Sequence, residues 1–227
     1  MTSTRVPLPV LAPATGAEID RSRLAEELRR HVDGDIRFGR LDRLLYATDA
    51  SIYQVEPIGV VVPRTIDDAA AALRICANRG VPVLPRGGGT ALAGQTVNVA
   101  VVIDFSQYCR RVVDIDPEAR TARVEPGVVL DQLNAQLVPH GLMFGPDVAT
   151  ASHATIGGMI GNNSAGAWSL RYGRTVEHLL EVEVALPGGE RMTFGEGSAE
   201  RDPRVRALAE PLAAIVRRIA PEIRARY

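Results

Sequence analysis

Residues 85–94 have the sequence Pro-Arg-Gly-Gly-Gly-Thr-Ala-Leu-Ala-Gly and directly follow the short apolar run Val81–Leu84. Three consecutive glycines after a predicted strand let the backbone adopt positive φ and turn successive N–H groups into one concavity that suits an anion. Arg86 and the Thr90 hydroxyl would add one charged and one neutral donor. A tight loop between strands is the alternative, and this motif taken alone does not distinguish the two.

Two established phosphate-binding motifs are excluded for this loop. The dinucleotide fingerprint GxGxxG fails because Leu92 occupies the position of its last glycine. All 26 basic residues are arginines, so a Walker loop and Schiff-base chemistry, which both need lysine, are also excluded. A phosphate would therefore have to be bound by arginine and by backbone N–H groups.

A second glycine-rich window runs from residue 154 to 166 and continues to residue 175. It begins Ala-Thr-Ile-Gly-Gly-Met-Ile-Gly-Asn-Asn-Ser-Ala-Gly and later contains Arg-Tyr-Gly-Arg-Thr at 171–175. Small residues with little charge are typical of backbone packed against a flat, extended ligand. The alternative is a glycine-rich helix packed on a sheet, with Met159 and Ile160 on its apolar side. Arg171 and Arg174 suit either an anionic substrate or a solvated loop.

The elements around these windows indicate an α+β fold. Ile58–Val62 is a predicted buried strand, Thr65 caps a helix over Asp67–Arg79, and Val81–Leu84 is the next strand. Such a βαβ unit has parallel strands. Further predicted elements are helices at 20–30 and 128–138, strands at 101–104, 111–115 and 121–125, a hairpin at 179–194, and a helical segment at 203–226 broken at Pro221.

Composition excludes several function classes. The 227 residues carry a formal net charge of −1 and 46% hydrophobic residues, as in an ordinary globular chain, and there is no basic excess for nucleic acid. No apolar run is long enough to span a bilayer, and no signal peptide is recognisable. The two cysteines and four histidines lack metal-site or disulfide spacing, which favours a reducing, cytoplasmic compartment.

Four motifs in order resemble one known family over about residues 46–195. They are Tyr-Ala-Thr-Asp-Ala-Ser at 46–51, Pro-Ile-Gly-Val-Val-Val-Pro at 57–63, the 85–94 loop, and the 155–175 window. The chain resembles the FAD-binding (PCMH-type) domain of the vanillyl-alcohol oxidase/p-cresol methylhydroxylase superfamily, in its D-lactate dehydrogenase, glycolate oxidase and D-2-hydroxyglutarate dehydrogenase branch. This implies a tail at 1–19 and two packed α/β subdomains, 20–105 and 106–227, with FAD between them.

The resemblance also implies which residues contact the cofactor. FAD would be bound non-covalently, because the pyrophosphate loop has no histidine for a covalent link. Glu181 to Val184 would pass near the adenine. The implied cofactor-binding residues are Pro85, Arg86, Gly87, Gly88, Gly89, Thr90, Leu92, Gly94, Gln95, Pro146, Asp147, Thr155, Gly157, Gly158, Asn162, Asn163, Ala165, Gly166, Tyr172 and Gly173.

The function expected from the resemblance is the FAD-binding part of a flavin-linked dehydrogenase of D-2-hydroxy acids such as D-lactate, glycolate or D-2-hydroxyglutarate. The family's GSEGT-type strand, substrate (cap) domain and histidine-bearing motif are not found, so the second subdomain is expected to be incomplete. Relatives often carry histidine at the position of Trp168. No catalytic or metal-binding residue is therefore assigned.

Other hypotheses remain open from the sequence. The chain could be a truncated domain without activity, acting as half of a split enzyme with a partner subunit or as an interaction module. An enolpyruvyl-sugar reductase of the same superfamily is a third hypothesis, although its NADPH-site residues are not recognisable. An electron acceptor could also hold the protein at the inner membrane as a peripheral protein.

Overall fold

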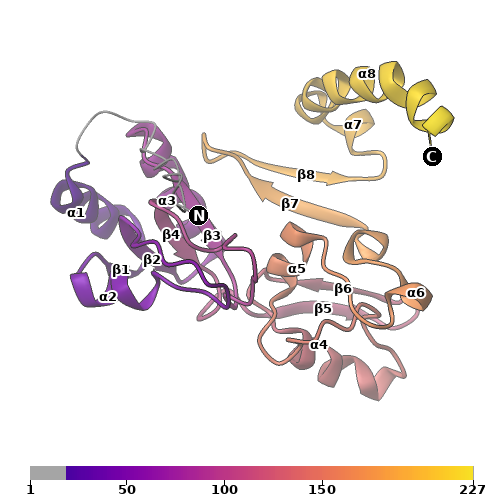
Figure 1. Ribbon diagram of the computed structural model, residues 1–227, viewed down its shortest axis with the longest axis horizontal. Helices are drawn as coiled ribbons and strands as arrows, with labels where there is room; N and C mark the ends of the chain where they lie inside the picture. Colours follow the sequence, from indigo (N-terminus) through magenta and orange to yellow (C-terminus); the bar gives the residue numbers. More distant parts are fainter. Residues whose placement is uncertain (1–18, 227) are drawn as a thin grey trace, which may run out of the picture.

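A computed structural model describes residues 19–226, so the predicted tail at 1–19 lies almost wholly outside the described residues (Figure 1). Its largest sheet has four strands in the order β1-β2-β4-β3. These are β1 (Gly34–Arg37), β2 (Gly59–Pro63), β4 (Val101–Asp104) and β3 (Val83–Arg86). The predicted parallel βαβ unit is confirmed, with β4 inserted between its two strands; β1 adds an antiparallel edge.

Two helices cover one face of this sheet. They are α1 (Arg21–His31) and α3 (Ile66–Asn78). The predicted helix cap at Thr65 is confirmed for α3. The Thr65 hydroxyl accepts a hydrogen bond from the Asp68 N–H, and the Asp68 carboxylate accepts one from the Thr65 N–H. Leu24, Leu28 and Val61 are buried between helices and sheet. Every residue of β2 is buried, as expected for a central strand covered on both faces. A short helix, α2 (Arg40–Leu45), occupies a stretch for which the sequence indicated no structure.

A second apolar core lies beyond residue 105. The hairpin of β5 (Val112–Asp116) and β6 (Thr121–Val124) packs with α4 (Leu130–Leu137), the 3-10 turn η1 (Val138–His140) and α5 (Ile156–Asn162). Leu130, Leu133 and Met159 are its buried centre. The mixed α and β fold class is as predicted, whereas the division at residue 105 stays a prediction.

The last part of the chain contains a second hairpin and a long helix. Its elements are α6 (Ser169–Tyr172), η2 (Thr175–His178), β7 (Glu181–Ala185), β8 (Arg191–Gly195), α7 (Ser198–Arg201) and α8 (Pro203–Arg226). The hairpin returns to the first body, where Arg191 Nη2 lies 2.6 Å from Asp67 Oδ1 in α3. No helix among residues 19–226 is both long and apolar enough to cross a membrane.

The predicted break at Pro221 is wrong. Helix α8 continues through both Pro211 and Pro221. A proline inside a helix removes one N–H donor and leaves the carbonyl four residues earlier without its partner. Those carbonyls belong to Ala207 and Arg217, which are exposed, so water can hydrate them and the helix need not end.

Candidate functional site

The glycines of the 85–94 loop serve two different purposes. Gly89 and Gly94 have φ of 65° and 77°, in the left-handed region. Gly87 and Gly88 instead permit close packing: a Cβ on Gly87 would lie 2.0 Å from Thr155 Oγ1, and one on Gly88 would lie 2.1 Å from the His153 carbonyl oxygen. The two glycine-rich windows, separate in the sequence, are therefore in direct contact.

The backbone N–H groups of residues 87–90 are the most distinctive feature of this contact. None of these four groups donates a hydrogen bond to an acceptor among residues 19–226. Loop N–H groups at such a junction are normally paired, with protein or with water. Four successive donors without an acceptor among the described residues are available to water or to an anion.

A cavity of about 380 Å³ is lined by the first two of these residues, Gly87 and Gly88. Its wall combines residues from both windows with polar groups from the first sheet. The Tyr46 hydroxyl donates to Asp104 Oδ2 at 2.7 Å, and burial together with this bond raises the pKa of Tyr46 above its ordinary value. The lining residues are Leu45, Tyr46, Arg86, Gly87, Gly88, Asp104, Ser106, Gln107, Val129, Ser152, His153 and Thr155.

Arg86 does not extend into open space from the loop. Its guanidinium donates to three backbone carbonyls, those of Tyr46, Thr48 and Thr96, at 3.3, 2.8 and 3.1 Å. Leu92 and Gln95 lie farther along the loop and are exposed, and Gln95 Oε1 accepts from the Ala93 N–H at 3.1 Å. Cofactor contacts by Pro85, Arg86, Thr90, Leu92, Gly94 and Gln95 stay predictions.

The second window is helical at its start, so the alternative of a glycine-rich helix is confirmed for residues 156–162. Thr155 is buried and caps α5, with its Oγ1 accepting from the Gly158 N–H at 3.3 Å. Gly157 lies against Pro126, whose Cβ would be 2.6 Å from an added Cβ. Asn162 ends the helix, and Asn163 adopts a left-handed conformation while its Oδ1 accepts from the Val176 N–H.

Residues 146–147 and 165–173, for which flavin-side contacts are predicted, contact each other. Gly166 lies against the backbone of Asp147, and Asp147 Oδ1 accepts from the Trp168 N–H at 2.8 Å. The Trp168 and Tyr172 rings are 6.4 Å apart, and Trp168 is exposed. Pro146 is buried, whereas Ala165 is exposed. The two windows thus meet at Gly87 and Thr155. Cofactor contacts stay predictions for the remaining residues of the second window and its neighbours, namely Pro146, Asp147, Gly157, Gly158, Asn162, Asn163, Ala165, Gly166, Tyr172 and Gly173.

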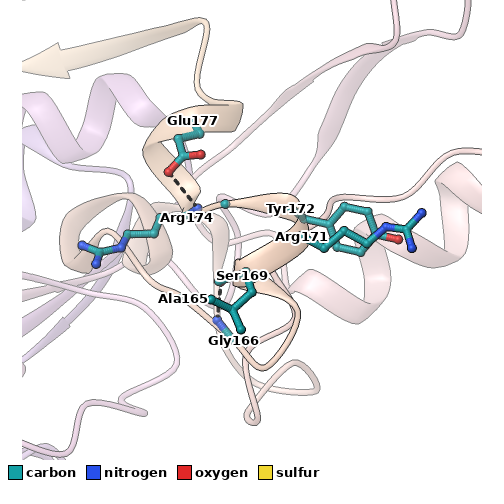
Figure 2. Close-up of a pocket in the computed structure, with 9 residues that line it drawn as sticks. Ala165, Gly166, Ser169, Arg171, Tyr172, Arg174 and Glu177 are labelled. Atoms are coloured by element: carbon teal, nitrogen blue, oxygen red, sulfur yellow. Dashed lines mark hydrogen bonds between the residues drawn. The ribbon is translucent and has the colours of Figure 1, made fainter.

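A second cavity, of about 520 Å³, is lined by Ala165, Gly166, Glu177 and residues 169–174. Figure 2 shows the Arg171 and Arg174 side chains pointing away from each other. The Arg171 guanidinium lies over the Tyr172 ring at 5.5 Å, and the Arg174 N–H donates to Glu177 Oε1. Since the two arginines do not converge on one point, this arrangement favours the solvated-loop alternative over an anion site.

Sequence reasoning missed several groups at the first cavity. Asp104, Ser106 and Gln107 follow or end a predicted strand, and no motif marks them. Asp104 is only 4% exposed, and its second oxygen accepts from the Ser106 N–H at 2.8 Å. A polar residue at the carboxyl end of a parallel strand was the available signal, because ligands bind at that edge. No group of three metal-ligating side chains occurs among the described residues.

Related sequences of known proteins cover most of the chain. The family model described as "FAD binding domain" matches residues 57–195. D-2-hydroxyglutarate dehydrogenase of Escherichia coli (strain K12) is 40% identical over 187 residues, which are 81% of this chain and 18% of that protein. Glycolate oxidase subunit GlcD of Escherichia coli (strain K12) is 33% identical over 81% of this chain and 37% of its own length. The probable mitochondrial D-lactate dehydrogenase of Danio rerio is 33% identical over 76% and 35%.

Solved structures show the same fold. p-Cresol methylhydroxylase with substrate bound superimposes with a TM-score of 0.70 and 20% identity, covering 80% of this chain and 37% of that one. Alkyldihydroxyacetonephosphate synthase gives 0.68 and 21%, covering 77% and 38%. The chain therefore spans less than two fifths of the length of each of these proteins.

Proposed function

Because the chain belongs to the FAD binding domain family, we propose that it binds FAD non-covalently where its two glycine-rich windows meet. The observation that carries this proposal is the row of four N–H groups at 87–90 without acceptors among the described residues. The first two of these residues, Gly87 and Gly88, line a cavity together with Thr155 of the second window. These donors suit the two phosphates of FAD, because backbone N–H groups can approach a pyrophosphate closely where no Cβ intervenes.

The residues around the donors fit the remainder of such a ligand. Gly87 and Gly88 keep the loop free of side chains, and Thr155 fixes the start of α5 beside it. Asp147 contacts Gly166 and the Trp168 N–H, and we expect these residues to contact the flavin side of the ligand. When bound, the flavin would supply hydride-accepting chemistry. The part of the chain described here would bind and orient it, and none of its side chains is assigned a proton-transfer role.

For the whole protein, we propose oxidation of a D-2-hydroxy acid such as D-2-hydroxyglutarate, glycolate or D-lactate. Support comes from the named relatives, which are 33% to 40% identical to this chain. The same proposal includes the predicted cytoplasmic location. It also includes the partner subunit and the electron acceptor that this activity implies.

Cofactor binding is tested by mixing the purified chain with FAD, removing free ligand by desalting and recording the visible spectrum. We expect the absorption bands of an oxidised flavin to stay with the protein. Gly88→Val should remove them, because its side chain would collide with the His153 carbonyl. Gly80→Asn is the control: no atom lies within 4 Å of a Cβ added to Gly80, and Asn tolerates the positive φ of that position. A wild-type chain that retains no flavin would contradict the proposal.

A second candidate function is that of a cofactor-binding part that acts only together with another polypeptide. The exposed apolar side chains along α8 favour this candidate, because monomeric proteins seldom expose so many apolar side chains on one helix. We expect the chain with FAD to reduce a dye acceptor with none of the three hydroxy acids. Turnover by the chain alone would contradict this candidate.

A further inference from the structure

We propose that Arg86 is a positioning residue that holds the phosphate-binding loop in shape, rather than a ligand of the phosphates. The inference rests on the proposed function for its ligand, FAD. Arg86 ends β3 and immediately precedes the row of unpaired N–H groups at 87–90. Its guanidinium is bound by three backbone carbonyl oxygens of the protein itself.

The three acceptors come from two separate segments. Tyr46 and Thr48 belong to residues 46–51, here named the strap, which precedes the 57–195 range of the family match. Thr96 lies at the far end of the glycine-rich loop. The guanidinium also lies 5.3 Å from the centre of the Tyr46 ring. One side chain thus joins the start of the loop, its end and the strap.

Further hydrogen bonds join the strap to the same loop. Asp49 Oδ2 accepts from the Thr96 N–H at 3.3 Å and from the Thr96 hydroxyl at 2.8 Å. The Ala50 N–H donates to the Gly89 carbonyl at 3.0 Å. Gly89 closes over the guanidinium, and an added Cβ there would lie 2.7 Å from Arg86 Nη2. Residue 96 is therefore held from two sides, by Arg86 and by Asp49.

This arrangement explains how a glycine-rich loop can bind a phosphate group with little loss of backbone conformational entropy. Glycines lose more backbone entropy on ordering than other residues, and a loop fixed before binding avoids that cost when the ligand arrives. Three of the five N–H donors of the Arg86 guanidinium already bind carbonyls, whereas the N–H groups at 87–90 have no acceptor among residues 19–226. The loop is thus held in shape by the planar arrangement of the guanidinium donors, and not by the positive charge of Arg86 alone.

The decisive experiment compares Arg86→Lys and Arg86→Gln in FAD titrations followed by flavin fluorescence, at several salt concentrations. If Arg86 positions the loop, both variants raise Kd to a similar extent, by about tenfold, because one ammonium cannot replace three directed donors. Their dependence of Kd on salt should parallel that of the wild type. Arg218→Gln, an exposed change of the same charge on α8, should leave Kd unchanged. A lysine variant that keeps wild-type affinity while the glutamine variant loses salt dependence would overturn the proposal.

A second readout does not depend on FAD. Amide hydrogen exchange of the ligand-free chain should be faster at Ala50 and Thr96 in both Arg86 variants, while β2 keeps its protection. Unchanged exchange at these two amides would overturn the proposal whatever the affinity. If the wild type binds no FAD, the proposed function fails, and the exchange rates still decide whether Arg86 holds the loop. Should Arg86→Gln unfold, Arg86→Lys gives the same test, because it keeps the charge but not the three directed donors.

Discussion

At the scale of single residues, the sequence indicates which segments form the candidate site but not which atoms contact one another there. Arg86 was predicted as a phosphate donor because arginine is the only cationic donor with a permanent charge in this chain. In the structure its guanidinium binds carbonyls of residues far away in the sequence. Contacts between residues forty positions apart leave no local pattern, so single-sequence reasoning had no access to them. By contrast, the caps at Thr65 and Thr155 depend on neighbours three residues away, and Thr65 was predicted.

Asp49 gives a residue-scale prediction about pH. Burial alone would raise its pKa, but hydrogen bonds from Ser51 and Thr96 outweigh burial and lower the pKa below the ordinary value. A carboxyl group with a lowered folded-state pKa stabilises the fold above its ordinary pKa, and that contribution is lost as pH falls through the lowered value. We expect Asp49→Asn to lower Tm near neutral pH, with the difference from wild type shrinking on acidification. Thermal unfolding at several pH values measures this, and a difference that grows toward acid pH would refute it.

At the scale of elements, local signals predicted most of the fold. Alternating and apolar runs placed β2, β4 and the two hairpins, and capping residues placed α3, because these signals act within a few positions along the chain. The course of α8 through Pro221 could not be predicted in this way. Whether a proline ends a helix depends on the solvation of the carbonyl one turn earlier, which is a property of the folded surface.

The long helix α8 allows a matched pair of substitutions. Val205, in its first turn, is 2% exposed, whereas Leu212, two turns later, is 64% exposed. Val205→Ala should lower the free energy of unfolding by about 1–2 kcal/mol, because it removes buried methyl groups. Leu212→Ala should change it by less than about 0.5 kcal/mol, as substitutions at exposed positions do. Urea denaturation of both variants provides the measurement. A large loss from Leu212→Ala would show that the apolar face of α8 is covered.

At the scale of the whole molecule, the candidate site depends on how the two apolar cores join. One junction lies at Gly127, where an added Cβ would be 2.1 Å from the Phe105 carbonyl oxygen and 2.6 Å from that of Cys109. The Gly127 N–H also donates to the Cys109 carbonyl at 2.8 Å. Each core has its own buried residues, so a substitution at this junction can change how the two cores are arranged without unfolding either core. The windows at 87–88 and 153–155 lie on opposite sides of it in the sequence.

FAD bound between the two windows would stabilise only a molecule in which these cores keep their native arrangement. A ligand at a hundredfold excess over its Kd adds about 2.7 kcal/mol to the free energy of unfolding, so the wild-type Tm should rise when FAD is added. Gly127→Val should abolish that rise, because its side chain forces the backbone at 105–109 away from residue 127. Gly141→Asn is the matched control: Gly141 has φ of 67° with nothing within 4 Å, so the rise in Tm should persist. Differential scanning calorimetry with and without FAD distinguishes these outcomes. Only a ligand that bridges both cores depends on the junction between them. A Gly127→Val variant whose Tm still rises fully on addition of FAD would therefore mean that the cofactor contacts one core alone.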